Sequence, residues 1–223
     1  NITTRNYELM HYPVRARLLT NDEKRIARLY TDKLLKRLPI RRPWSSCKEK
    51  HFHFDPSVLN LGDNVYLDGY WQSYKYFANI DELLKLELNS QKKMNDADKK
   101  VWADIKTTNS VAIHVRRGDY VSVKSVAQTH GVCSLNYYRR AIDIVTHSVK
   151  NPNFFIFSDD PEWVSEHLST TYPTSYVTHN GPENAFQDLR LMSLCQHQII
   201  ANSSFSWWGA WLNTNPEKIV IAP

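Results

Sequence analysis

The chain has 223 residues, of which 42% are hydrophobic and 12% aromatic, and this composition excludes an intrinsically disordered protein. No apolar run approaches the roughly 20 residues that cross a bilayer, so the sequence predicts no membrane-spanning helix. The net charge of +5 favours an anionic partner but does not separate a nucleic acid, a nucleotide and a membrane surface.

Cysteine usage and the two ends of the chain give further expectations. Cys47, Cys133 and Cys195 lack the spacing of a zinc site or a disulfide framework, which favours a reducing compartment. The chain begins at Asn1 without a signal sequence and ends on the apolar run 218–222. We therefore expect it to be part of a longer protein.

Residues 1–107 are expected to form a partial N-terminal α/β domain. Apolar residues at near-helical spacing predict a helix over 21–38, which Asn21 or Asp22 can cap. The other elements expected in this part are strands at 51–55 and 64–71, a helix at 80–88 and a polar bridge at 89–109.

Eight basic side chains lie between Lys24 and Arg42, within and beyond the first predicted helix. A basic amphipathic helix can dock on anionic lipid, and this stretch could serve in that way. A run of this kind is more often the solvated face of a helix. Both interpretations stay open at the level of the sequence.

Residues 108–223 are expected to form one Rossmann-like domain, because predicted strands alternate with predicted helices. The strands are expected at 111–115, 153–157, 175–178, 198–201 and 218–222, and the helices at 134–149, 160–168, 184–195 and 207–213. Strands separated by helix-length segments form βαβ units and a parallel sheet. The sequence therefore predicts an α/β fold.

The end of the first of these strands carries the most informative residues. His114, Arg116, Arg117 and Asp119 lie there, and ligands of α/β sheets bind at the carboxyl ends of strands. Two guanidinium groups suit a diphosphate, because each can hold phosphate oxygens in a bidentate manner and keeps its charge. The alternative is a surface ion pair between Arg117 and Asp119, with Arg116 solvated.

Two further strand ends carry polar groups that are expected to face the same crevice. Ser158, Asp159 and Asp160 follow the second strand, and the turn 202–206 follows the fourth. Hydroxyl groups and free backbone N–H groups at a helix N-terminus favour an anion. The alternative for this turn is a simple serine N-cap.

Asp188 lies in the predicted helix 184–195. A carboxylate in a first turn is favourable by itself, and near a nucleotide it can accept both N1–H and N2–H of guanine. The sequence has no GxGxxG motif, no Walker lysine loop, and no DxD motif where a nucleotide-bound magnesium ion is expected. Transfer of a sugar from a nucleotide would therefore depend on arginine to stabilise the departing diphosphate.

Five segments resemble the α-1,2-fucosyltransferase family, which transfers fucose from GDP-fucose to galactosides. They are LDGYWQSYKYF at 67–77, HVRRGDY at 114–120, FIFSDDP at 155–161, DLRLMS at 188–193 and ANSSFSWWGAWL at 201–212. The resemblance covers about residues 65–223. The family's N-terminal glycine-rich segment, of the type GGLGNQ, has no counterpart in this sequence.

The resemblance implies an inverting, metal-independent transferase of GT-B-like architecture, whose C-terminal Rossmann-like half holds GDP. Arg116 would bind the β-phosphate and offset the charge of departing GDP, and Asp119 is a candidate general base that could instead orient an arginine. Arg117 could also support the loop rather than the substrate. The residues assigned to substrate binding are His114, Arg117, Asp159, Asp188, Ser203, Ser204, Phe205 and Ser206.

The implied partners are GDP-fucose and a galactose-containing glycan, with no metal or other cofactor. The alternative is a catalytically silent GDP-sugar-binding fragment, because the missing glycine-rich segment approaches both substrates in related enzymes. A nucleic-acid partner is not expected, since no basic and aromatic stripe is visible. Few cysteines and short loops favour a bacterial cytoplasmic enzyme, peripheral at the inner membrane, over a luminal domain of the Golgi.

Overall fold

The computed structural model describes residues 7–122 and 131–223, apart from the side chains of Asp119 and Ser122. The chain forms two compact units. The smaller is Val14–Glu87, and the larger combines Leu88–Pro223 with the described residues before 14. The expected boundary between residues 107 and 108 differs from this division, because residues 88–107 belong to the larger unit.

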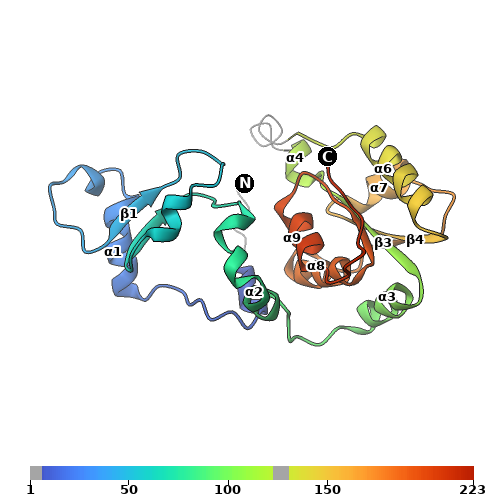
Figure 1. Ribbon diagram of the computed structural model, residues 1–223, viewed down its shortest axis with the longest axis horizontal. Helices are drawn as coiled ribbons and strands as arrows, with labels where there is room; N and C mark the ends of the chain where they lie inside the picture. The colour runs from blue at the N-terminus through green and yellow to red at the C-terminus, as the bar shows by residue number, and fades with distance from the viewer. Residues whose placement is uncertain (1–6, 123–130) are drawn as a thin grey trace. The chain divides into compact units, whose positions relative to one another are not determined.

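A parallel sheet forms the centre of the larger unit (Figure 1). Its strands are β3 (Asn109–Val115), β4 (Pro152–Ser158), β5 (Thr174–Val177), β6 (His197–Ile199) and β7 (Val220–Ile221), in the order β5-β4-β3-β6-β7. Every pair of neighbouring strands is parallel. The predicted α/β fold with a Rossmann-like sheet is confirmed.

Helices cover both faces of this sheet. The helical elements of the larger unit are α3 (Asp96–Thr107), α4 (Gly118–Ser122), α6 (Leu135–Ser148), α7 (Pro161–His167), α8 (Ala185–Leu194) and α9 (Ser204–Leu212), with the 3-10 turns η1 (Glu8–His11) and η6 (Pro182–Asn184). Alternate residues of a strand point to opposite faces. Ile113 and Ile156 therefore pack with α6 and α7, while Ala112, Phe155 and Phe157 pack with α3 and α8.

The smaller unit is built around aromatic side chains. Its elements are α1 (Asn21–Thr31), η2 (Leu35–Arg37), β1 (Ser45–Lys48), η3 (Pro56–Asn60), β2 (Val65–Asp68), η4 (Tyr74–Tyr76), η5 (Ala78–Ile80) and α2 (Asp81–Glu87). Strands β1 and β2 are parallel. The buried ring of Tyr30 stacks on Trp44 and Tyr66, with centroids 6.0 and 5.3 Å away. Its hydroxyl donates to the Trp44 carbonyl and accepts the Trp44 N–H at 2.8 Å.

Three predicted elements differ from the structure. Helix α1 ends at Thr31 rather than at 38, because the Asp32 carboxylate accepts the N–H groups of the following turn. Residues 51–55 form no strand, and the partner of β2 is Ser45–Lys48 instead. The stretch 89–109, expected to be a polar bridge, contains α3, whose Ile105 is buried against the sheet.

The structure also describes the state of the cysteines and the character of the helices. Cys47, Cys133 and Cys195 are free thiols, and burial raises the pKa of Cys195. Within residues 7–122 and 131–223, no helix combines the length and the apolar character that a bilayer span requires.

Candidate functional site

The carboxyl ends of β4, β3 and β6 lie side by side in the middle of the sheet, and the predicted polar residues follow them. From β3 the chain adds β4 and β5 on one side and then β6 and β7 on the other. The strand order therefore reverses between β3 and β6. Ligands of open α/β sheets bind outside the carboxyl ends at such a point.

Arg116 directly follows β3 and forms an ion pair with Asp159, which follows β4. The Arg116 Nη1 lies 2.9 Å from Oδ2 of Asp159, and the guanidinium carbon lies 5.4 Å from the ring centroid of Tyr120. The other Asp159 oxygen accepts the backbone N–H of Arg117 at 2.8 Å. A Cβ on Gly118 would lie 2.5 Å from Asp159 Oδ2, so the glycine permits this approach. The contacts hold the Arg116 guanidinium in a fixed direction.

Arg117 has a different environment. Its Nε lies 3.0 Å from Oδ2 of Asp160, and its guanidinium carbon lies 3.5 Å from the ring centroid of Trp163. Asp160 caps α7, in which Trp163 lies. Arg117 therefore fastens α7 to the end of β3. The sequence alternative, a pair between Arg117 and Asp119, is not tested, because the side chain of Asp119 lies outside the described residues.

His114 lies near the end of β3 and is only 4% exposed. Burial, and then the charge of Arg116, lower its pKa to about 3, so the imidazole is neutral at physiological pH. Its ring centroid lies 5.4 Å from that of Phe205. The buried Nδ1 has no hydrogen-bond partner among the described residues. A neutral imidazole with an unsatisfied nitrogen can form one more hydrogen bond.

The serines before and within the first turn of α9 differ in their contacts. Ser203 is the N-cap, because its Oγ accepts the N–H of Phe205 at 3.3 Å. The hydroxyl of Ser206 is fully buried and bonds with the backbone of Ala201 and Ser203. Ser204 is exposed. The serine N-cap of the sequence alternative is therefore present, and Ser206 contributes to holding the turn.

A second polar cluster follows the end of β5. The Asn180 side-chain nitrogen donates to Asp188 at 2.8 Å and to Asp98 at 2.9 Å, and His179 Nε2 lies 2.8 Å from the same Asp98 oxygen. Asp98 is completely buried. Burial raises the pKa of Asp188 to about 6, although the hydrogen bond from Asn180 acts in the opposite direction. In the part of the chain that the structure describes, no group of three or more His, Cys, Asp or Glu could hold a metal ion.

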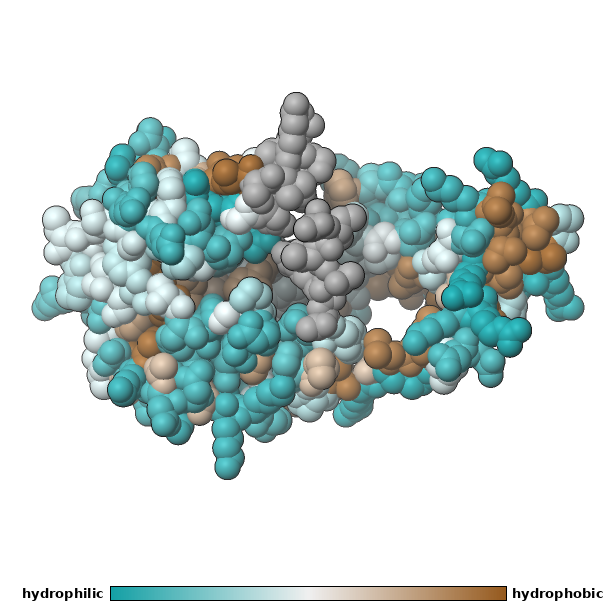
Figure 2. Space-filling view, turned by 180° about the vertical axis from the view of Figure 1, so that it is seen from behind, coloured by the Kyte–Doolittle hydropathy of each residue, from teal (hydrophilic) through white to brown (hydrophobic). Residues whose placement is uncertain are grey.

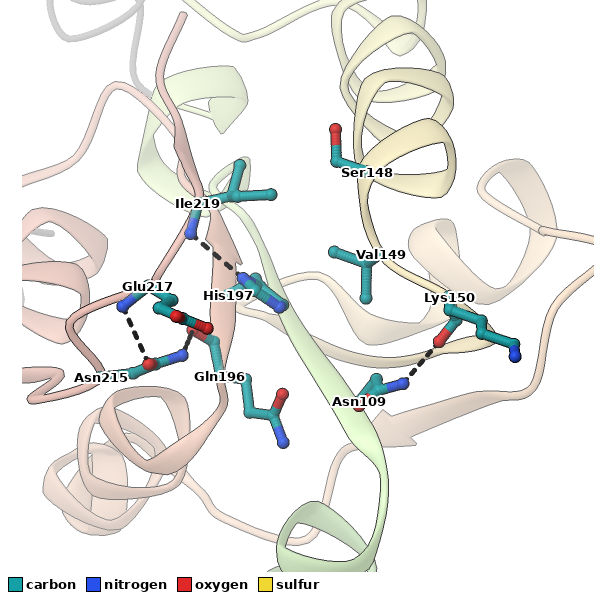
Figure 3. A pocket seen from close by; sticks show the side chains of 9 residues that line it. All are labelled: Asn109, Ser148, Val149, Lys150, Gln196, His197, Asn215, Glu217 and Ile219. Carbon is teal, nitrogen blue, oxygen red and sulfur yellow. Dashed lines mark hydrogen bonds between the residues drawn. The ribbon is translucent and has the colours of Figure 1, made fainter.

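A polar pocket of about 580 Å³ lies at the opposite edge of the sheet (Figure 3). Asn109 and His197, the first residues of β3 and β6, contribute to its lining. The Asn109 side chain donates to the Lys150 carbonyl at 2.5 Å, and His197 Nδ1 accepts the Ile219 N–H at 3.1 Å. Because ligands of such sheets bind at the carboxyl edge, this pocket does not belong to the candidate site.

Comparison with known protein families shows to which family the chain belongs. The model of glycosyl transferase family 11 matches residues 42–223. The chain belongs to glycosyl transferase family 11. The matched range contains the ends of β3, β4 and β6, so the family resemblance carried by the sequence segments is confirmed.

Proteins with related sequences include bacterial and primate enzymes. The α-1,2-colitosyltransferase of Escherichia coli is 40% identical over 168 residues, which cover 74% of this chain and 57% of that protein. The O-antigen biosynthesis glycosyltransferase WbnK of Escherichia coli is 41% identical over 116 residues, or 52% of this chain and 38% of that protein. The galactoside α-(1,2)-fucosyltransferase 1 of Gorilla gorilla gorilla is 25% identical over 181 residues, or 77% and 49%.

The solved structures that match part of the chain include POFUT1 in complex with GDP-fucose, with a TM-score of 0.46 and 14% identity over 72% of this chain and 54% of that one. For NodZ α-1,6-fucosyltransferase soaked with GDP-fucose, the TM-score is 0.42 at 15% identity, over 70% and 55%. The chain spans about half the length of the curated relatives it matches.

Most of the residues predicted for a family 11 site lie at the carboxyl edge of the sheet. Arg116 and Asp159 meet there, and His114 meets Phe205. Asp188 belongs to the separate cluster beyond β5. Sequence reasoning missed Asp98 and Asn180, because no local pattern connects residues that lie 82 positions apart.

Proposed function

We propose that the chain provides the donor-binding part of a fucosyltransferase that moves L-fucose from GDP-fucose to the 2-hydroxyl of a terminal β-galactoside. Membership of family 11 supports glycosyl transfer, and the α-1,2 relatives support the linkage. The observation that carries the proposal is the Arg116 guanidinium, held by Asp159 at the point where the strand order reverses.

Arg116 is proposed to stabilise the leaving group. As the bond between fucose C1 and the β-phosphate oxygen breaks, negative charge grows on GDP. A guanidinium already directed by an ion pair can offset this charge without reorganising. The acceptor hydroxyl attacks the opposite face of C1 and gives up its proton, so a β-linked donor yields an α-linked product. Asp119 stays the candidate for the base that receives this proton.

His114 and Asp188 are proposed to recognise guanosine. His114 is neutral because its pKa is about 3, so it adds no charge, and its Nδ1 can form a further hydrogen bond. Above its pKa of about 6, Asp188 is a carboxylate that can accept N1–H and N2–H of guanine. Adenine does not present these two donors together, and the site is therefore expected to prefer GDP to ADP.

The first turn of α9, in which Ser204 is exposed, is proposed to bind the diphosphate together with Arg116. Ser203 fixes the start of the helix, and Ser204 is exposed beside it. Unpaired N–H groups and the helix dipole both favour an anion at this end. The reaction is proposed to need no divalent ion, so GDP release from the donor should continue in EDTA.

A second sugar is favoured by one observation. The α-1,2-colitosyltransferase of Escherichia coli is 40% identical over 74% of this chain. We therefore propose colitose as the alternative sugar at the same nucleotide site. Parallel assays with GDP-fucose and with the colitose donor distinguish the two, because the correct donor gives the higher kcat/KM.

Two experiments test the proposal in sequence. Calorimetry with GDP, ADP and UDP is expected to show a preference for GDP, and equal affinity for all three would contradict the nucleotide assignment. Release of GDP from GDP-fucose is then measured with lactose or N-acetyllactosamine as acceptor. Acceptor-dependent release supports the transferase. GDP binding without any release would support the alternative, a catalytically silent GDP-sugar-binding fragment.

A further inference from the structure

The strongest concentration of positive charge in the molecule lies outside the candidate site. Residues 24–42 hold eight basic side chains and one acidic one, Asp32. This excess is larger than the net charge of +5 of the entire chain, so the rest of the sequence is net negative. The charge of the protein is therefore localised on one stretch of the smaller unit.

Exposed apolar side chains interrupt these cations in the basic loop, defined as residues 33–41. Leu34 is 75% exposed, Leu38 48% and Ile40 40%. The cations between and beside them, which are Lys33, Lys36, Arg37 and Arg41, are also exposed. Single exposed leucines are ordinary, but three large apolar residues within one short loop require an explanation. Figure 2 shows hydrophobic and hydrophilic residues lying side by side on the surface of this unit.

Hydrogen bonds between two side chains and the backbone hold the basic loop in this conformation. The Asp32 carboxylate accepts the N–H groups of Leu34 and Leu35 at 2.8 and 3.1 Å. The Arg42 guanidinium donates to the carbonyls of Leu29, Leu35 and Lys36 at 3.2, 3.2 and 2.9 Å. The loop is anchored at both ends. The leucines are therefore presented to solvent by a fixed backbone.

We propose that the basic loop docks the protein on an anionic phospholipid surface. Leu34, Leu38 and Ile40 enter the boundary between headgroups and acyl chains, and the four interleaved cations contact lipid phosphates. This arrangement of apolar and basic side chains is the one that binds such surfaces. A second copy of the chain is disfavoured as occupant, because it would bring two concentrations of positive charge together. A nucleic acid would leave the three apolar side chains in water.

Vesicle sedimentation tests the proposal with the chain as it exists. Vesicles of mixed phosphatidylglycerol and phosphatidylcholine are compared with vesicles of phosphatidylcholine alone. Binding is expected to be at least about tenfold stronger to the anionic vesicles and to weaken as salt rises. Equal binding to both vesicles, or binding to neither, would overturn the proposal.

Two sets of substitutions separate the charge from the apolar contribution. Replacing Lys33, Lys36, Arg37 and Arg41 by Glu is expected to weaken anionic vesicle binding by about a hundredfold or more. Leu34→Ser with Leu38→Ser leaves the charge unchanged and is expected to weaken binding by about tenfold. Full binding by this leucine variant, with competition by RNA, would show a nucleic-acid surface and overturn the proposal.

The matched control reverses the same number of charges on the larger unit. Its substitutions, all at exposed positions, replace Lys99, Arg139, Arg140 and Lys150 by Glu. Vesicle binding is expected to fall much less in this control than in the variant with four Glu residues in the basic loop. An equal fall would show that only the net charge of the protein determines vesicle binding, and it would overturn the proposal. Hydrogen exchange at residues 14–87, expected to be unchanged in the loop and leucine variants, reports that the smaller unit is folded, and unchanged exchange at β3 and β4 reports the same for the larger unit in the control. Self-association that disappears with the leucine substitutions, without vesicle binding, would identify a second copy as the occupant.

Discussion

The two units of this chain are stabilised by different means. In the larger unit, β3 and β4 are covered on both faces, and the phenylalanines of β4 are completely buried or nearly so. In residues 14–87, all of which the structure describes, Tyr30 is the only buried hydrophobic side chain. Removal of apolar surface from water is the main favourable contribution to folding. The larger unit therefore carries most of the stability, and its strand ends give the candidate site a rigid support.

The largest expected effect is on the core of the larger unit. Phe155 is completely buried in β4, so Phe155→Ala should lower the free energy of unfolding by about 3–5 kcal/mol. Phe52, which is 72% exposed in the smaller unit, supplies the control. Phe52→Ala should change the free energy by no more than about 0.5 kcal/mol. If urea denaturation showed equal losses for Phe155→Ala and Phe52→Ala, the conclusion that the larger unit carries most of the stability would be wrong.

Arg116→Ala should separate function from stability within the larger unit. Removing a charged partner of a bound phosphate should weaken GDP binding by about a hundredfold and abolish transfer. Arg117→Ala is the control, because Arg117 lies against Trp163 and Asp160. Compared with Arg116→Ala, the Arg117→Ala variant should have a lower melting temperature and should lose less GDP affinity. Near-normal turnover of the Arg116 variant would remove its proposed role in stabilising the leaving group.

Tyr30→Phe tests whether the smaller unit can be destabilised without an effect on the larger unit. The substitution keeps the ring stack and removes the hydroxyl that bonds with the Trp44 backbone. The expected loss is about 1–2 kcal/mol, because the Trp44 N–H then lacks its acceptor. Hydrogen exchange should accelerate at residues 14–87 and stay unchanged at β3 and β4. Acceleration in both units would show that they unfold together.

The smallest expected effect is a dependence of GDP affinity on pH. Burial raises the pKa of Asp188 to about 6, so the carboxylate that would accept guanine N–H groups is lost as pH falls through that value. Affinity should fall by up to about tenfold per pH unit below it. The same shift makes the contribution of this buried group to stability decrease as pH rises toward 6. Asp188→Asn should remove both dependences, and an unchanged pH profile of affinity in this variant would contradict the assignment.

The larger unit has a buried apolar core and the smaller unit has almost none, and this difference determined how much of each unit the sequence could predict. All five strands of the sheet were expected close to their observed places, since FFIF and IIA are apolar runs that read as buried strands. In the smaller unit, the end of α1 depends on Asp32 and Arg42, which act through hydrogen bonds that no periodicity reveals. Helix α3 was missed because most of its residues are polar and only a narrow side is buried.

Within the candidate site, the sequence predicted residues that the structure brings to one edge of the sheet, but it did not predict how they pair. The ion pair between Arg116 and the Asp159 carboxylate joins two strand ends that lie far apart along the chain. Register between β3 and β4 brings Val115 opposite Ser158, and this places the two charged residues beside each other. Such pairing follows from strand order, which spacing along one sequence does not fix. The partners of Asp188 were missed for the same reason.

The double engagement of Asp159 has a consequence for any anion that approaches Arg116. One carboxylate oxygen pairs with the guanidinium and the other accepts a main-chain N–H, so the carboxylate stays beside the arginine. An approaching anion is attracted by one charge and repelled by the other, and Arg116 therefore attracts it less than an arginine without a neighbouring carboxylate would. Under the proposed function, the first turn of α9 has to supply part of the attraction for the diphosphate.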